Sequence, residues 1–287
     1  MSTSQHRWIS GRIDSRGARG AQLRGCAPLP YPHFQIALHV RCAAACPMKK
    51  LLLHRDVYAC RTDDGAVLLD LTTGKYFGLG LETTAAIAPR IQGWIDRKSD
   101  GADEDCQLDE IESAGILNSL MNDLGLLTDS LELGKPVIPP LLSPTESVPF
   151  RGNLLPWPRI SGRHIMAFCC AYLQALFELR CVPIACTVRR VQARKSHCEG
   201  AAASMTGTLE LVRIFRVLRP FLFTAKNHCL FDSLALIEFL ARFGGFPTWV
   251  IGVRTRPFGA HSWVVHGNLI LNELLEETEG FSPILAV

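Results

Sequence analysis

Residues 227–236 read NHCLFDSLAL, and this stretch predicts how the second half of the chain folds. Asn227 is a favourable N-cap residue, and the apolar residues after it recur at helical spacing, so a helix should begin here. Cys229 then falls in the first turn, where unpaired backbone N–H groups and the helix dipole favour a thiolate. A lone cysteine in such a place is more often a small buried hydrophobic residue. Whether Cys229 is a nucleophile therefore depends on the other catalytic residue types that the sequence supplies.

A histidine and a pair of polar residues follow Cys229 along the chain. His261 comes 32 residues later, within residues 257–265, which read PFGAHSWVV and alternate as a strand does. Glu273, preceded by Asn272, comes 12 residues after His261. A cysteine on a helix, a histidine on a strand and an amide or carboxylate on the next strand form the arrangement of papain and the transglutaminases. The spacing predicts a nucleophile, a base and an orienting residue, and both Asn272 and Glu273 are open for the third role.

Three strings in this half carry a family resemblance. Residues 229–230 with 233–236, residues 250–258 (VIGVRTRPF) and residues 260–264 (AHSWV) resemble the lasso-peptide B protein family. Its members are transglutaminase-like cysteine peptidases that cut the leader from a ribosomal precursor peptide. The resemblance covers roughly residues 160–287 and implies that Cys229 is the nucleophile and His261 the general base. The family usually carries an aspartate as third member, and this chain departs from it with Glu273, so the orienting residue stays open.

The first half of the chain has strand-like and then helical patterning. The expected elements are three short strands at 57–61, 66–71 and 75–79, a helix over 81–95 interrupted at Pro89, and one or two short helices between 108 and 124, closed by Gly125. Residues 67–77 (VLLDLTTGKYF), 81–85 (LETTA) and 124–127 (LGLL) resemble the precursor-peptide recognition element. This element is a small winged-helix domain, similar to the chaperone of pyrroloquinoline quinone synthesis.

That second resemblance implies a way of binding the leader. In such families the leader adds a strand beside the third β-strand, against the last helix. The implied leader-binding residues are Lys75, Tyr76, Phe77, Leu79, Leu117, Leu120, Met121 and Leu124. For any one of the leucines, a place in the domain core is the simpler role. A winged helix could also bind DNA, but six acidic residues between 103 and 112 argue against it.

The fold class expected from these patterns is α+β. A small winged-helix-like domain, with a three-stranded sheet plus helices, precedes a papain/transglutaminase-like domain with helices packed on an antiparallel sheet. The second domain should have helices at 162–182, in pieces to 193, at 209–218 and at 229–243, and strands at 248–253, 261–265 and 269–271. The expected domains are 1–47, a disordered tail or a mis-assigned start; 48–130, leader recognition; 131–160, a proline-rich linker; and 161–287, the peptidase.

Charge and hydropathy exclude two classes of function. Residues 1–47 carry six arginines and one acid, Asp14, whereas the rest of the chain holds 24 basic and 26 acidic side chains. The near-neutral body lacks the basic surface of a nucleic-acid-binding protein. Apolar runs fall short of the roughly 18 residues that a membrane-spanning helix needs, so no membrane association is expected.

The cysteine pattern indicates neither a disulfide framework nor a metal site. The 11 cysteines are odd in number, no secretory signal precedes them, and a reducing cytoplasm with mostly buried thiols is the expectation. A zinc site among His164, the cysteines that follow it and His197 lacks any C-x-x-C pair, so no metal is expected. No G-x-x-x-x-G-K-S/T loop occurs, so no cofactor is evident and any ATP dependence would come from a partner. Asp232 is expected as a solvated helix residue.

The sequence as a whole predicts a fused leader-recognition domain and cysteine peptidase. Its partners by resemblance are the ribosomal precursor peptide and an asparagine-synthetase-like lasso cyclase. An acyltransferase would use the same acyl-enzyme, and no sequence feature separates it from a peptidase. A non-catalytic peptide-binding scaffold is the other alternative, and the intact pair of Cys229 and His261 argues against it.

Overall fold

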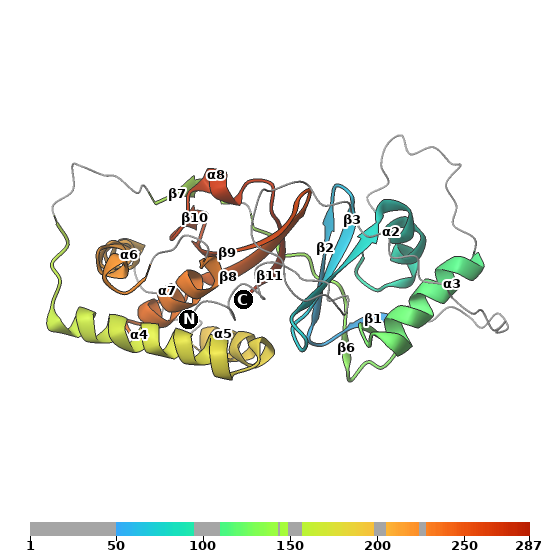
Figure 1. Ribbon diagram of the computed structural model, residues 1–287, viewed down its shortest axis with the longest axis horizontal. Coiled ribbons are helices and arrows are strands. Elements are labelled where there is room, and N and C mark those ends of the chain that lie inside the picture. The colour runs from blue at the N-terminus through green and yellow to red at the C-terminus, as the bar shows by residue number, and fades with distance from the viewer. Residues whose placement is uncertain (1–49, 95–109, 143, 149–156, 198–204, 224–227) are drawn as a thin grey trace, which may run out of the picture.

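Two lobes lie side by side along the longest axis of the computed structural model (Figure 1). The structure describes residues 50–94, 110–142, 144–148, 157–197, 205–223 and 228–287. The expected tail at 1–47 lies outside this range. Both lobes combine helices with mainly antiparallel sheets, so the α+β fold class is confirmed in its coarse form.

The first lobe is built on the three strands that the sequence predicts. Strands β2 (Val57–Thr62), β3 (Gly65–Asp70) and β4 (Lys75–Gly80) form a meander in that order. Helix α2 (Leu81–Ile87) follows, and the 3₁₀ turn η1 (Ala88–Arg90) ends it because Pro89 cannot continue an α-helix. Further along lie helix α3 (Glu110–Asn118) and the π-helical turn η2 (Ser119–Asp123).

This lobe has a second small sheet, which the sequence patterns did not predict. Its central strand β1 (Leu52–His54) pairs with β5 (Leu127–Thr128) on one side and with β6 (Gly134–Lys135) on the other. Val137 is buried in the core of the same lobe. The first lobe therefore extends past residue 130, where the linker was expected to begin.

The second lobe packs helices against a five-stranded sheet. The strand order is β11–β8–β9–β10–β7, where β8 is Thr248–Thr255, β9 is Phe258–His266, β10 is Leu269–Ile270 and β11 is Ser282–Ala286. Its helices are α4 (Gly162–Cys181), α5 (Ile184–His197), α6 (Met205–Leu218), α7 (Cys229–Ala241) and the short α8 (Leu275–Thr278). Helix α7 is buried along almost its whole length, so it is the central helix of the lobe (Figure 1).

The remaining edge strand of this sheet comes from the expected linker. Strand β7 (Glu146–Ser147) pairs in parallel with β10, and Val148 is buried in the core of the second lobe. The proline-rich composition concealed these contacts because extended, proline-rich chain also suits an edge strand. Residues 131–160 thus contribute to the sheets of both lobes, which a simple linker would not do.

The two lobes share a hydrophobic core along β3. All six residues of β3 are buried, since this strand is covered on both faces. Leu68 faces the core of the first lobe, whereas Val67 and Leu69 belong to the core cluster of the second. Polar contacts join the lobes at the nearby turns: Thr255 donates a hydrogen bond to Asp64 at 2.6 Å, and Arg256 lies 2.8 Å from the same carboxylate. The lobes therefore form a continuous structure.

Candidate active site

Cys229 lies at the start of the central helix, as the sequence predicts. Helix α7 begins at Cys229 itself, with His228 in the N-cap position; Asn227, the expected N-cap, lies outside the described residues. The thiol is buried, with 8% of the residue exposed. Backbone N–H groups of Ser262, Leu230 and Cys229 lower the pKa of the thiol, but burial is the larger effect and raises it above its ordinary value. The expected thiolate is therefore not the resting state, and a base is needed to form it.

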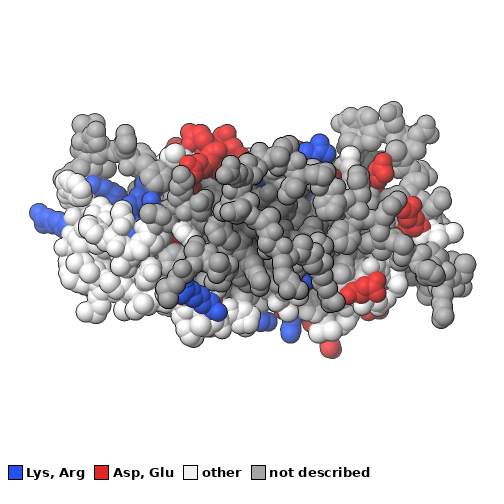
Figure 2. Space-filling view, viewed as in Figure 1, with Lys and Arg blue, Asp and Glu red and all other residues white. Residues whose placement is uncertain are grey.

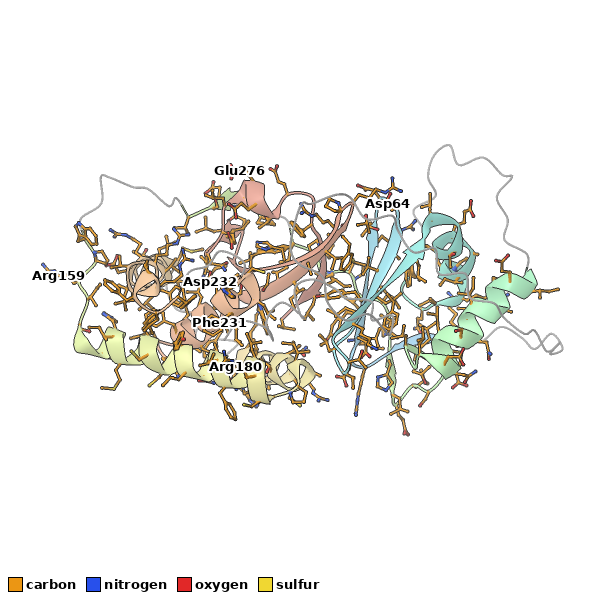
Figure 3. All side chains as sticks on the ribbon, in the orientation of Figure 1. Asp64, Arg159, Arg180, Phe231, Asp232 and Glu276 are labelled. Carbon is orange, nitrogen blue, oxygen red and sulfur yellow. The ribbon has the colours of Figure 1, made fainter. Side chains whose placement is uncertain are left out.

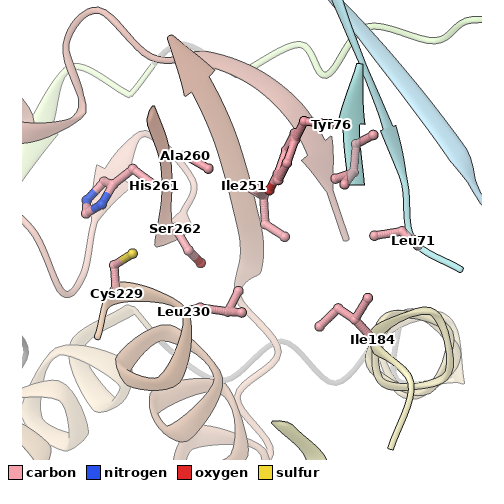
Figure 4. A pocket seen from close by; sticks show the side chains of 10 residues that line it. Leu71, Tyr76, Ile184, Cys229, Leu230, Ile251, Ala260, His261 and Ser262 are labelled. Carbon is pink, nitrogen blue, oxygen red and sulfur yellow. The ribbon is translucent and has the colours of Figure 1, made fainter. Parts of the chain in front are cut away.

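His261 lines the same pocket as Cys229, and the two side chains lie next to one another in Figure 4. The imidazole, on strand β9, lies near two aromatic rings, with ring centroids 6.0 Å from Trp263 and 5.3 Å from Phe281. Burial lowers its pKa, so the neutral imidazole, which can accept a proton, is favoured. Gly252 on the neighbouring strand β8 leaves room for the Trp263 ring, since a Cβ atom at this position would lie 2.5 Å from that ring.

Glu273 is the acid that approaches the imidazole. Its Oε1 lies 3.8 Å from Nε2 of His261, longer than a hydrogen bond but close enough to form one after a small shift. The Nε2 atom is buried and has no hydrogen-bond partner within the described part of the chain. The structure therefore brings together three of the residues that the sequence selected: Cys229, His261 and Glu273.

The environment of Glu273 keeps its carboxyl largely neutral. Burial raises its pKa to about 8, and a hydrogen bond that the neutral carboxyl donates to the neighbouring Glu277 adds to the shift. Figure 2 shows acidic side chains gathered over α8, the helix that carries Glu276 and Glu277. This acidic surface favours the neutral form of Glu273 because a further negative charge there would be repelled.

Asn272, the other candidate for the third position, serves a different part of the fold. Its Oδ1 accepts a hydrogen bond from the backbone N–H of Val264 at 2.8 Å. Its Nδ2 donates to Asp232 and to Ser233, each at 3.1 Å. With these bonds the amide links β9 to helix α7. Its acceptor and donor groups are therefore engaged in holding the helix against the sheet.

Asp232 is wholly buried, so its expected place on a solvated helix face is wrong. Arg219, in the 3₁₀ turn η3 (Arg219–Phe221), reaches both of its carboxylate oxygens, at 3.1 and 3.2 Å. In Figure 3 the label of Asp232 lies over α7, inside the second lobe. Helical periodicity could not reveal this partner, which lies 13 residues earlier on another element. The ion pair fixes the start of α7, three residues after Cys229.

The residues expected to bind the leader occupy three kinds of position. Leu117 and Leu120 are buried in the core of the first lobe, and Met121, Phe77 and Leu79 pack partly against that core. Lys75 and Leu124 are exposed. Tyr76 points instead toward the second lobe, where it lines the pocket at Cys229 (Figure 4). Sequence patterning alone gave no sign that this residue belongs to the site.

The remaining expectations concern the burial of the cysteines, a metal site and membrane-spanning helices. Among the cysteines there, Cys60 and Cys229 are buried but Cys169, Cys170, Cys181 and Cys186 are exposed, so the expectation of mostly buried thiols is wrong for this part of the chain. No group of three or more histidine, cysteine or acidic side chains within the described ranges could hold a metal ion. No described helix is long and apolar enough to cross a membrane.

Comparison with known protein families gives a match to the transglutaminase-like superfamily over residues 166–286. A search of the curated proteins found no match, and neither did a search of the solved structures. The second lobe is therefore a transglutaminase-like domain, a fold shared by cysteine peptidases and acyltransferases. The superfamily match confirms this part of the sequence interpretation. The first lobe lies outside the matched residues.

Proposed function

We propose that this protein is the leader peptidase of a lasso-peptide pathway, which binds a ribosomal precursor peptide and cleaves it at the leader–core junction. The observation that supports this most directly is the shared pocket of Cys229 and His261 in a transglutaminase-like domain, with Glu273 behind the imidazole. The resemblance of residues 250–258 and 260–264 to the lasso-peptide B proteins supplies the substrate class.

In the proposed reaction His261 acts as the base. Because its Nε2 faces Glu273, Nδ1 is the nitrogen available to take the proton from the Cys229 thiol. The sulfur then attacks the carbonyl carbon at the junction, and the protonated imidazole gives its proton to the departing amine. A thioester remains, which water hydrolyses with His261 again as the base, so that the thiol is regenerated. Burial lowers the pKa of the imidazole, and this favours release of its proton to the departing amine.

The start of α7 supplies the electrostatic part of catalysis. Backbone N–H groups of Cys229 and Ser262 act on the sulfur and lower the pKa of the thiol. Such fixed donors would stabilise the negative oxygen that develops on the attacked carbonyl. Glu273 would orient the ring by accepting a hydrogen bond from Nε2–H, which its carboxyl oxygen can do in the neutral form as well.

The first lobe would bind the leader through β4. Among the described strands, β4 pairs with β3 alone, so its other edge can accept a peptide strand. Phe77 and Leu79 anchor this strand on the core of the lobe. We further propose that the cyclase partner, rather than this chain, brings any ATP dependence, and that the protein acts in the cytoplasm.

The experiment combines the full chain with a synthetic lasso precursor peptide that carries its leader. Hydrolysis at one position, seen by mass spectrometry, supports the peptidase; a product carrying an added amine would show acyl transfer instead. Hydrogen exchange of the Cys229→Ala chain should show that residues 75–80 gain protection when the peptide binds. Absence of any covalent or cleaved product from the wild-type chain would contradict the proposal.

A further inference from the structure

The pocket at the nucleophile has walls from both lobes. Its described lining residues are Leu69, Leu71 and Tyr76 from the first lobe and Ile184, Cys229, Leu230, Ile251, Ala260, His261 and Ser262 from the second. Figure 4 shows Tyr76 and Leu71 on the strands of the first lobe, across β8 from His261. The site that carries the thiol is therefore incomplete without the sheet of the other lobe.

Tyr76 is held in this wall by the alternation of β4. Phe77 and Leu79 face the core of the first lobe, so Tyr76, between Lys75 and Phe77, faces the opposite way. Its ring packs edge-on against Phe258 of β9, with the centroids 5.6 Å apart. Burial and the nearby Cys229 raise the pKa of the phenol, so it stays neutral in the wall. The ring is fixed by contacts from both lobes.

The size and the lining of this pocket define what it can accept. Apart from Cys229, His261 and Ser262, the lining side chains are aliphatic or aromatic, so a charged group would lose its hydration without a partner. The cavity volume is about 30 Å³. A single water-sized group takes roughly 10–15 Å³ on this scale, so the pocket has room for a small side chain but not for an aromatic ring.

We infer that Tyr76 is a specificity-determining residue: it closes a two-lobe subsite that takes a small, uncharged side chain next to the scissile carbonyl. The inference rests on the proposed function, because it assumes that Cys229 attacks a peptide carbonyl. It assigns to the first lobe a role beyond holding the leader. The same strand that offers its edge to the peptide also sets the side chain admitted beside the thiol.

The test uses two probes that need no leader: the chloromethyl ketones of acetyl-alanine and acetyl-phenylalanine. The Cys229 sulfur forms a bond to the methylene carbon and chloride leaves, so the rate of mass gain at this residue reports access to the pocket. Peptide mapping separates Cys229 from the exposed thiols, and the Cys229→Ala chain gives the background. The wild-type chain should prefer the alanine probe by about tenfold or more.

Two substitutions of Tyr76 should shift the preference between the probes in opposite directions. Tyr76→Leu enlarges the pocket and should lower the alanine-to-phenylalanine ratio at least about fivefold, whereas Tyr76→Trp narrows it and should raise the ratio. A ratio of two rates on one enzyme cancels any general loss of reactivity. Tyr76→Trp keeps the test decisive if the leucine variant fails to fold.

Tyr58→Leu is the matched control. Tyr58 and Tyr76 are the two cross-strand neighbours of Leu69, one on each side, and Tyr58 is absent from the described pocket lining. Its substitution should leave the ratio within about twofold of the wild type. An unchanged ratio in both Tyr76 variants, with Cys229 still labelled, would overturn this inference alone. Failure of both probes to label Cys229 in the wild-type chain would instead count against the proposed function.

Discussion

The side chain of Asn272 accepts a hydrogen bond from the backbone N–H of Val264 at 2.8 Å, and this bond joins two neighbouring segments of one sheet. The carbonyl oxygen that an orienting amide would offer to His261 is thereby occupied. Glu273, the next residue, points its carboxyl toward the imidazole instead. Of the two residues that the sequence left open, the geometry therefore favours Glu273 for the third position of the proposed triad.

Removal of either proposed reacting group should abolish cleavage and spare the fold. Cys229→Ala removes the nucleophile, and His261→Ala removes the base that a thiol of raised pKa requires. We expect cleavage of the precursor peptide to fall by at least about 100-fold in both variants. Turnover is followed by mass spectrometry and peptide binding by fluorescence anisotropy. Full cleavage by Cys229→Ala would leave the non-catalytic scaffold as the better account.

Glu273 should tolerate a neutral acceptor but not an apolar side chain. Since its carboxyl is largely neutral near pH 7, Glu273→Gln keeps an oxygen that can accept the Nε2–H bond, and its turnover should stay within about fivefold of the wild type. Glu273→Leu loses that acceptor and should lower kcat about 10- to 100-fold with little change in KM. Equal activity in the two variants would show that Glu273 does not position His261.

The stability of the protein should also depend on Glu273 through pH. Its pKa rises from 4.5 to about 8 on folding, so the neutral group stabilises the fold fully below pH 4.5 and this contribution is lost as the pH rises to about 8. Glu273→Gln removes the ionisation. The Tm of Glu273→Gln minus the Tm of the wild type should therefore increase as the pH rises from 4.5 to about 8. A constant difference in Tm across the range would contradict the raised pKa.

Alkylation of Cys229 should follow the pH profile of a buried thiol. Because burial raises its pKa above the ordinary value of a thiol, the rate with iodoacetamide should still be rising at pH 9 in the absence of peptide. Mapping of the digest by mass spectrometry gives this rate for Cys229 alone, and the exposed Cys170 in the same digest serves as the reagent control. A rate that is flat from pH 5 to 9 would indicate a preformed thiolate and overturn this prediction.

The buried ion pair of Asp232 and Arg219 should contribute strongly to the free energy of unfolding. Arg219→Met leaves a buried carboxylate without its cation, and the free energy of unfolding should fall by about 3–5 kcal/mol. Adding Asp232→Asn removes that charge and should restore part of the loss. Urea denaturation of the two single variants and the double variant measures the coupling. Additive losses would mean that the pair does not stabilise the start of α7.

Local patterning was sufficient for the longer elements of this protein and for two residues of its candidate site. The spacing of apolar residues predicted the three strands of the first lobe and helix α7, because each of these forms from neighbours in the sequence. The same spacing selected Cys229 and His261, since a helix start and an alternating strand are both local features. The second domain's class followed from short strings around these residues and agrees with the superfamily match.

Tertiary structure decided the rest, because it depends on contacts between distant segments. The strands β1, β6 and β7 are only two or three residues long, too short for a period to be seen, and exist through their pairing partners. Asp232 is buried with its charge paired to Arg219 from another element, and the fold directs the adjacent Asn272 and Glu273 to different partners, Val264 and His261. The place of Tyr76 in the wall of the pocket that holds Cys229 follows from the packing of one lobe on the other, which no local pattern encodes.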